Sequence, residues 1–404
     1  MRMGTRTIAV CAIVCACASV AAAQGRAMTL SDVLTRAREQ APQIVSARLA
    51  LDERRARLIG ASVQNNPELD AWVGSRKSPT DRFADYQFGL TQRLEPGARR
   101  SARVEGANAA IAQSTVNIEE VTRTVLQQAA AAYYRAVHAS DRIRTLDAAY
   151  EVASNIYAAA DRRYKAGDIA ILDVNIARAS LARVRADREG AEAAKAVAVG
   201  DLRQLLRLDG DATVGGSLST PMPADLDVAL QAASSRPELR ALAAAIQEAE
   251  AERRVGLSFA KPQYGLGVSY SREEGDQIVL GGMTIALPLF SKGQEQQAAG
   301  SARAARLRSE FEAARARIDA EVRASFDAYN RRLSALRILE ADAIAGLDEN
   351  EQLTTRSFEA GQLGLLDLLL IRRETLDTRF QYLDALLEAA LARIDLDASA
   401  AMLR

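Results

Sequence analysis

The amino-acid sequence predicts an elongated, mainly α-helical protein with a small β part, in which one structural unit occurs twice. Three observations lead to this fold class. Motifs recur at a nearly constant offset along the 404 residues, which indicates a tandem duplication. Two long stretches lack proline and carry apolar residues at helical spacing, and short stretches of alternating residues lie between helical ones. We therefore expect duplicated long α-helical hairpins and four short β-strands.

The N-terminus has the pattern of a secretory signal peptide. An apolar stretch runs from Ile8 to about Val20, and three alanines then precede Gln24. This stretch is shorter than the ~20 residues that a membrane-spanning helix needs. We therefore expect residues 1–23 to be a cleaved signal peptide and not an uncleaved anchor.

All three cysteines, Cys11, Cys15 and Cys17, lie within this signal peptide. The mature chain then has no thiol for a disulfide, a nucleophile or a thiolate metal site. Attachment of a lipid at Cys17 is an alternative to simple cleavage, because residues 14–17 loosely resemble a lipoprotein cleavage box.

The composition argues against catalysis and nucleic-acid binding. Lys and Arg number 52 and so do Asp and Glu, so no excess of positive charge favours nucleic acid. His138 is the only histidine, whereas tight sites for soft metals need several His or Cys ligands. We expect His138 to be a surface or packing residue. The mature chain also lacks a phosphate-binding glycine loop, so we expect no enzyme, no resident metal and no cofactor.

The internal repeat is visible in several motifs. At an offset of 195, Asp32 and Val33 recur as Asp227 and Val228, and Pro42 and Pro67 recur as Pro237 and Pro262. At an offset of 194, the segment Tyr164–Asp173 matches Phe358–Asp367. We expect a first repeat over residues 24–210, a linker over 211–223 and a second repeat over 224–404.

Proline placement then outlines the helices, because a proline inside a helix removes a hydrogen bond and clashes with the preceding turn. No proline lies between Pro96 and Pro221 or after Pro288. We expect long helices over about 98–162 and 294–356, each approaching ~95 Å. A tight turn leads each into a shorter helix, over about 172–207 and 366–402. Further helices, over about 29–64 and 224–258, stack end to end with the shorter ones.

Strand pairs lie between these helices. Apolar residues alternate there with glycine and polar residues, the pattern of a transmembrane β-barrel. Four strands cannot close a membrane barrel, which needs at least about 8, so the chain must oligomerise to insert. Three copies would form a 12-strand barrel. The residues expected to face outer membrane lipid are Tyr86, Phe88, Leu90, Tyr264, Leu266, Val268 and Tyr270.

These features resemble the TolC family of outer-membrane efflux proteins over essentially all of the mature chain. The most specific parts are the doubled Tyr/Phe-x-Ala-Gly-x-x-x-x-Leu-Asp signature and the strand exit Ala286–Phe290. The resemblance implies a homotrimeric β-barrel in the outer membrane, continued across the periplasm by an α-barrel. It also implies a periplasmic adaptor protein and an inner-membrane pump as partners. The expected function is a passive exit duct of a tripartite efflux system.

The strand exits Gln92–Arg100 and Leu287–Gln294 are similar to those of the branch that exports heavy-metal cations, of the cobalt-zinc-cadmium type, with resistance-nodulation-division pumps. The chain departs from that branch at residues 95–97 and 291–292. Drug efflux and type I protein secretion therefore remain alternatives. A periplasmic coiled-coil adaptor is less favoured, because adaptors carry one hairpin and a lipoyl-like domain.

Function is expected to concentrate at the repeated turns. Gly167 and Gly361 suit a helix C-terminal position with positive φ. The family resemblance implies that Tyr164, Gly167, Phe358 and Gly361 dock the adaptor at the periplasmic tip.

Charged residues surround these turns. Asp173 and Asp367 are expected near the start of the returning helices, where a carboxylate accepts backbone N–H bonds and meets the positive helix end. These two residues and Asp168 are interpreted as helix caps, or alternatively as an acidic gate. Arg178 and Arg372 match across the repeat. They would either pair with nearby acids to hold the mouth shut or lie on the solvated surface.

Overall fold

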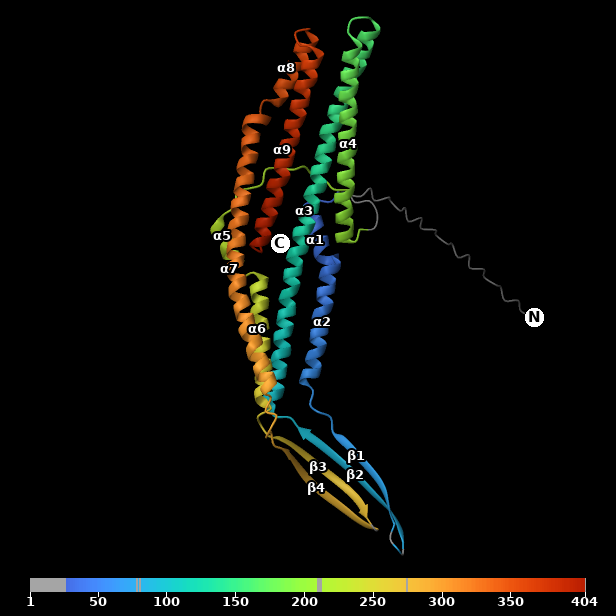
Figure 1. Ribbon diagram of the computed structural model, residues 1–404, viewed down its shortest axis with the longest axis vertical. Coiled ribbons are helices and arrows are strands. Elements are labelled where there is room, and N and C mark those ends of the chain that lie inside the picture. The colour runs from blue at the N-terminus through green and yellow to red at the C-terminus, as the bar shows by residue number, and fades with distance from the viewer. Residues whose placement is uncertain (1–26, 78, 80, 209–212, 274, 404) are drawn as a thin grey trace, which may run out of the picture.

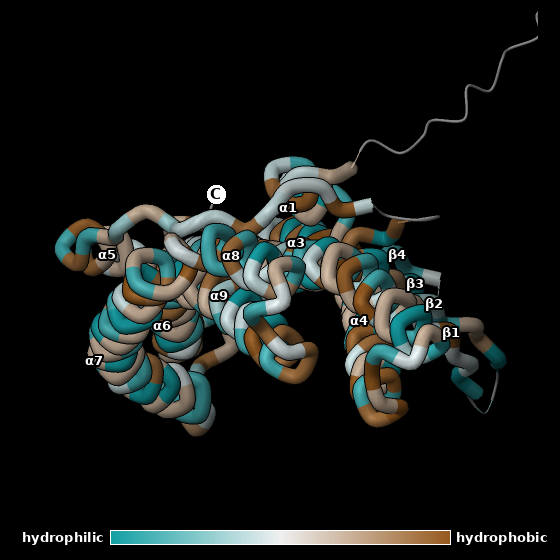
Figure 2. Tube along the Cα trace, turned by 90° about the horizontal axis from the view of Figure 1, so that it is seen from above, coloured by the Kyte–Doolittle hydropathy of each residue, from teal (hydrophilic) through white to brown (hydrophobic). Residues whose placement is uncertain are grey.

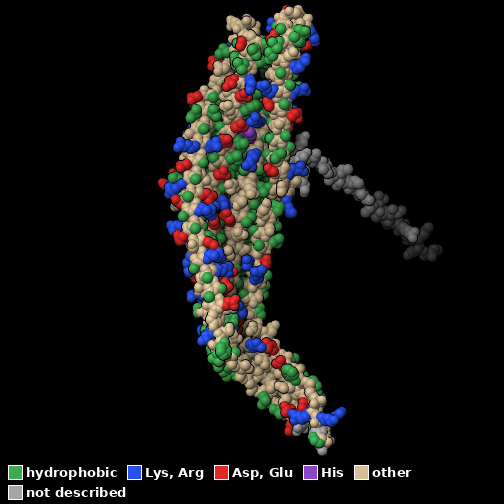
Figure 3. Space-filling view, in the orientation of Figure 1, with side chains coloured by type: hydrophobic (Ala, Val, Ile, Leu, Met, Phe, Trp, Pro, Cys, Tyr) green, Lys and Arg blue, Asp and Glu red, His purple; other side chains and the backbone are tan. Residues whose placement is uncertain are grey.

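The computed structural model describes residues 27–403 except 78, 80, 209–212 and 274. The expected signal peptide and Cys17 therefore lie outside the described residues. The molecule is elongated, with a small β-sheet at one end and two helical hairpins at the other (Figure 1), and the space-filling view shows the same elongated shape (Figure 3). The elements are, in order, α1 (Leu30–Gln40), α2 (Pro42–Ser62), β1 (Glu68–Lys77), β2 (Arg82–Leu94), α3 (Gly97–Lys165), α4 (Ile171–Leu206), α5 (Leu226–Ala233), α6 (Pro237–Ser258), β3 (Gln263–Glu273), β4 (Asp276–Ala286), α7 (Gln294–Ile338), the π-helix η1 (Leu339–Ile344), α8 (Leu347–Glu359) and α9 (Leu365–Ser399).

The predicted fold class is confirmed. Two short helices, two strands, a long helical segment and a returning helix occur in that order twice. Helix α3 is unbroken over 69 residues, which corresponds to ~100 Å. It runs from the sheet to the tip of its hairpin (Figure 1). None of the described helices is long and apolar enough to cross a membrane.

Two predicted helices are each divided by a proline. The expected helix over 29–64 is α1 followed by α2, and the one over 224–258 is α5 followed by α6. Pro42 and Pro237 are the first residues of α2 and α6. The backbone N–H of a first helical residue makes no hydrogen bond within the helix, so proline, which lacks this N–H, costs no hydrogen bond there. The preceding residues, Ala41 and Arg236, are extended, as residues before proline tend to be. The prediction of one continuous helix in each of these two ranges was therefore wrong.

The expected continuous helix over 294–356 is also interrupted. Helix α7 ends at Ile338, and η1 and a turn at Gly346 separate it from α8. The first repeat has Val152 where the second has Gly346, and α3 continues through that position. Glycine weakens a helix by about 1 kcal/mol relative to alanine. In η1, Glu340 accepts hydrogen bonds from Thr220 Oγ1 (2.5 Å) and the Tyr382 hydroxyl (3.0 Å).

The main core lies around the middle of α3, where this helix packs against α1, α4 and α9. Small residues on α3, among them Ala129 and Ala136, are fully buried and let neighbouring backbones approach closely. A second core joins α7 to α5 and α9 through Val322, Tyr329 and Leu396. Seen along its length, the molecule is a curved layer with α7 toward one side and α4 toward the other (Figure 2).

The four strands form one antiparallel sheet in the order β1-β2-β3-β4. The central pairing of β2 with β3 joins the two repeats, with Phe88 opposite Tyr270 and Leu90 opposite Val268. Among the described residues, β1 and β4 each have a partner strand on one side only. The sheet therefore has two open edges within the chain.

Candidate functional sites in the sheet and at the hairpin tips

One face of the sheet is apolar. Residues that are directly opposite in neighbouring strands point to the same face. By the observed register, the seven residues expected to face lipid share this face, and Leu69 and Val73 of β1 and Val279, Met283 and Ile285 of β4 extend it. Phe88 and Leu266 are each about half exposed, so the apolar face is uncovered within the chain.

The opposite face carries mostly small and polar residues. Thr91 lies opposite Gly267, and Gly89 lies opposite Ser269. A Cβ at Gly267 would approach Thr91 Oγ1 to 3.2 Å, so the small residue there fits a close strand neighbour. Trp72, which pairs with Gln87, also lies on this face and was not identified from the sequence. The two faces therefore differ sharply in polarity.

Arg99 is a buried residue that sequence reasoning also missed. Its Nε donates a hydrogen bond to Ser258 Oγ (3.0 Å), which joins the start of α3 to the end of α6. Burial lowers the pKa of the guanidinium, and the charge of Glu95 opposes this shift. The only sequence signal was its position in the strand exit Gln92–Arg100. Arg99 fixes the junction between the helices and the sheet.

Both hairpin turns have the same backbone geometry. Gly167 and Gly361 have φ of 85° and 74°, so the expectation of positive φ is confirmed. At the first turn, Gly167 N–H donates to the Tyr164 carbonyl, and Asp168 N–H donates to the Arg163 carbonyl. At the second, the amides of Gly361 and Gln362 make the corresponding bonds to Phe358 and Ser357. Each turn is a Schellman motif, which a left-handed glycine permits.

The four residues of the expected docking tip are not equivalent. Tyr164, Gly167 and Gly361 are exposed at the ends of the hairpins. Phe358 is half-buried and lines an opening between the two hairpins together with Ile156 of α3.

The expected cap hydrogen bonds of Asp173 and Asp367 are absent from the described residues. Both lie in the first turn of the returning helices, at the third helical position. The N-cap residues are Ala170 and Gly364, and neither N-terminus has a side-chain cap bond. The cap interpretation is therefore wrong in its hydrogen-bond part, and only the favourable interaction with the helix dipole remains. Asp168 lies exposed in the first turn.

The two matching arginines have different partners. Arg178 donates to the Tyr157 hydroxyl (3.4 Å) and lies over that ring. Of its two alternatives, pairing with an acid is not seen among the described residues, and its exposed position fits the solvated surface. Arg372 forms an ion pair with Glu351 of α8 (3.1 Å) and donates to Thr355 Oγ1 (2.6 Å). Both contacts stay within one hairpin.

Comparison with known proteins identifies the fold. Residues 33–206 match the family described as Outer membrane efflux protein. The chain is 25% identical over 386 residues to cobalt-zinc-cadmium resistance protein CzcC of Cupriavidus metallidurans, covering 92% of this chain and 89% of that protein. The matched segment, residues 33–206, belongs to the outer membrane efflux protein family. It is also 27% identical over 314 residues to Protein CyaE of Bordetella pertussis, covering 72% of this chain and 65% of that protein.

Solved structures agree with this family fold. A structure of CusC superposes with a TM-score of 0.76 at 17% identity, covering 92% of this chain and 91% of that chain. The open state of the MtrE outer membrane channel of Neisseria gonorrhoeae gives 0.75 at 18% identity, covering 93% and 89%. Members of the outer membrane efflux protein family are trimeric outer membrane channels that extend into the periplasm and work with an adaptor and an inner-membrane pump. They are not enzymes.

His138 lies within this matched segment and packs between the two repeats. Its Nε2 lies 2.7 Å from Asp384 Oδ1 on α9, and Arg142 donates to the same oxygen (3.1 Å). Arg142 also lies 4.2 Å over the ring of Phe380. No group of three or more His, Cys, Asp or Glu within the described part of the chain could hold a metal ion.

Proposed function

We propose that three copies of this chain form the outer membrane exit duct of a tripartite efflux system for heavy-metal cations. The observation that carries the proposal is the sheet, which has one apolar face and two open edges and lies at one end of helix α3, a helix ~100 Å long. The family fold supports it.

The open edges support a trimer. An unpaired strand edge in lipid leaves backbone N–H and C=O groups without partners, which costs several kcal/mol per group. With four antiparallel strands per chain, β4 of one copy can pair antiparallel with β1 of the next. Three copies then close a 12-strand barrel with the apolar face toward lipid and the small, polar face toward the pore. Both edges are used in the same way by every copy, as cyclic symmetry requires.

The helical part supports a duct across the periplasm. The curved layer of helices in one chain suits one sector of a hollow cylinder (Figure 2). The exposed tip residues Tyr164, Gly167 and Gly361 lie at the end opposite the sheet, where a periplasmic adaptor would meet the duct. Transport through such a duct is passive, and the inner-membrane pump supplies the energy.

The cargo is inferred from two similarities. The relative that matches 92% of this chain is a cobalt-zinc-cadmium resistance protein. The strand exits also resemble the heavy-metal branch of the family. A duct must release its cargo, so it does not need a tight metal site of its own.

Metal resistance in cells tests the cargo. The chain is expressed, with its native pump and adaptor, in a strain that lacks its own duct. We expect growth in cobalt, zinc or cadmium at concentrations that stop the strain without the duct. Restored resistance to organic drugs, or secretion of a protein, without any metal resistance would favour the drug-efflux or type I secretion alternatives.

A further inference from the structure

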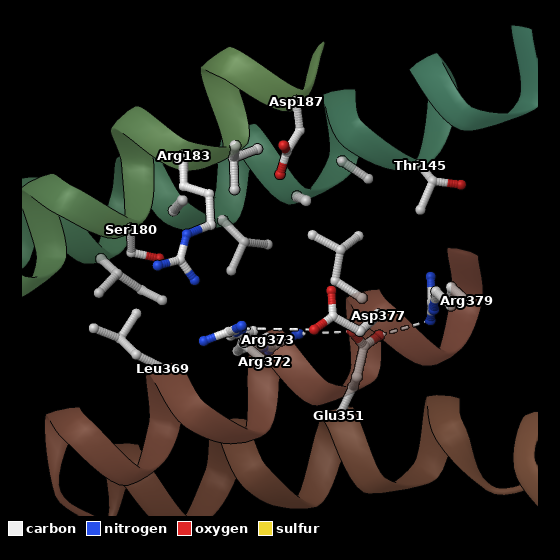
Figure 4. Close-up of a pocket in the computed structure, with 17 residues that line it drawn as sticks. Thr145, Ser180, Arg183, Asp187, Glu351, Leu369, Arg372, Arg373, Asp377 and Arg379 are labelled. Atoms are coloured by element: carbon white, nitrogen blue, oxygen red, sulfur yellow. Dashed lines mark hydrogen bonds and ion pairs between the residues drawn. The ribbon is translucent and has the colours of Figure 1, made fainter. Parts of the chain in front are cut away.

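A cavity of about 260 Å³ lies between the two hairpins, between the middle of the helices and the tips. It is lined by α3 and α4 of one hairpin and by α8 and α9 of the other (Figure 4). Any molecule held here would contact both repeats of the chain.

The wall on the side of α3 is apolar. Ala149, Val152 and Ile156 of α3 line the cavity, and Val184 of α4 and Leu376 of α9 extend the apolar surface. Ligand pockets in proteins combine such a surface with a few convergent polar groups. This cavity is slightly smaller than those that hold drug-sized ligands, so its ligand would be a smaller molecule.

Within the described chain, the charged groups that line the cavity are four guanidinium groups and three carboxylates, so positive charges exceed negative ones by one. They are Arg183, Arg372, Arg373, Arg379, Asp187, Glu351 and Asp377. Arg183 of α4 points across the opening toward Arg372 and Arg373 of α9 (Figure 4). Like charges that approach one another from two packed elements repel, unless an anion lies between them. The arrangement therefore favours a negatively charged guest.

The nearby carboxylates do not neutralise all three arginines. Among the described residues, Arg183 has no hydrogen bond or ion pair. Within the described ranges, Arg373 has a single ion pair, an exposed one with Asp377 at 3.6 Å. Glu351 is shared between Arg372 (3.1 Å) and Arg379 (2.8 Å).

One guanidinium nitrogen is left without a partner. Arg372 Nε is buried and has no hydrogen-bond partner in the part of the chain that the structure describes, although the other nitrogens of this group bind Glu351 and Thr355. A buried donor without a partner costs about 1–3 kcal/mol.

We propose that this cavity binds a small amphipathic organic anion. Its carboxylate or sulfonate head lies among Arg183, Arg372 and Arg373, and its apolar body lies against Val152 and Ile156. Charge-assisted hydrogen bonds from guanidinium to an anion are about twice as strong as neutral ones. Because Arg183 and Arg372 belong to different hairpins, the bound anion links the two hairpins and restrains their separation.

The test uses the trimer in lipid nanodiscs and the probe 2-naphthalenesulfonate, with binding measured by isothermal titration calorimetry. We expect saturable binding, and none for the uncharged analogue 2-naphthalenemethanol or for sulfate alone. Arg183→Gln should weaken binding at least tenfold, because it removes one charge-assisted contact. Val152→Phe should also weaken it, by filling the apolar part of the cavity, while the trimer stays intact.

Arg185→Gln is the matched control. Arg185 also lies on α4, but its guanidinium is 5.9 Å over the ring of Tyr150 and does not line the cavity. This change should leave the affinity within twofold. Equal weakening by the Arg183 and Arg185 changes would show attraction to surface charge alone and overturn the proposal. Binding of 2-naphthalenemethanol with the affinity of the sulfonate, or of sulfate alone, would also overturn it.

Discussion

The guanidinium of Arg99 lies 3.9 Å from the centre of the Phe259 ring, at the junction between helices and sheet. Arg99 is the third residue of α3, which follows β2, whereas Phe259 is the C-cap residue of α6 and precedes β3. This single contact therefore joins the two repeats at the point where both central strands leave the helices. The side chain of Arg99 also donates to Ser258, so the contact is both cation–π and hydrogen-bonded.

Replacement of Arg99 by alanine should destabilise the folded chain. It removes a cation–π contact and a hydrogen bond from a charged donor, so we expect a loss of about 2–4 kcal/mol. The measurement is the free energy of unfolding in urea, monitored by loss of the folded form on gels. Arg100→Ala is the control, because Arg100 is exposed and adjacent in sequence. An equal effect of both changes would contradict the special role of Arg99.

The two faces of the sheet can be compared at neighbouring positions. Val268→Lys places a charge on the apolar face, and Ser269→Lys places the same charge on the opposite face. If the apolar face contacts lipid, the first change should cost about 2–4 kcal/mol near the bilayer centre, and the second should cost little. Folding into liposomes, followed by heat-modifiable gel mobility, measures the difference. Equal costs at the two positions would argue against a lipid-facing side.

The turn glycines can be tested separately from assembly. Gly167→Val and Gly361→Val force a β-branched residue into left-handed backbone, at a cost of about 1–3 kcal/mol each. Open space surrounds both positions, so the strain is in the backbone alone. We expect the double variant to lose efflux while trimers remain in the outer membrane.

Gly190→Ala is the control for the turn variants. Gly190 lies within α4 with open space around a new Cβ, so this change should keep full efflux. Normal metal resistance in the double turn variant would contradict a docking role for the tips.

Much of the fold could be predicted because helix length and strand alternation are local signals. The absence of proline after Pro96 predicted α3 nearly to its ends, and the alternation around Phe88 and Val268 placed seven residues on one face. The breaks at Pro42 and Pro237 were missed, although each proline fits only the first turn of a helix.

The partners of the site residues could not be predicted. Arg178 meets Tyr157 across its hairpin, and Arg372 meets Glu351 across the other. Helical spacing shows which residues share a face of one helix, but the register of two packed helices depends on side-chain packing along both. The same limit hid the stacking of Arg99 on Phe259.

The break between α7 and α8 should depend on Gly346. At Gly346, φ is −104° and an added Cβ would meet only Asn350 Nδ2, at 3.8 Å, so alanine fits without strain. Alanine stabilises a helix by about 1 kcal/mol relative to glycine. Gly346→Ala should therefore slow amide hydrogen exchange in residues 339–350 by up to about fivefold. Val152→Gly is the reciprocal change in the first repeat and should speed exchange in the middle of α3. If both variants exchange like the original chain, the glycine does not set the difference between the repeats, and the hydrogen bonds of Glu340 to Thr220 and Tyr382 would account for the break alone.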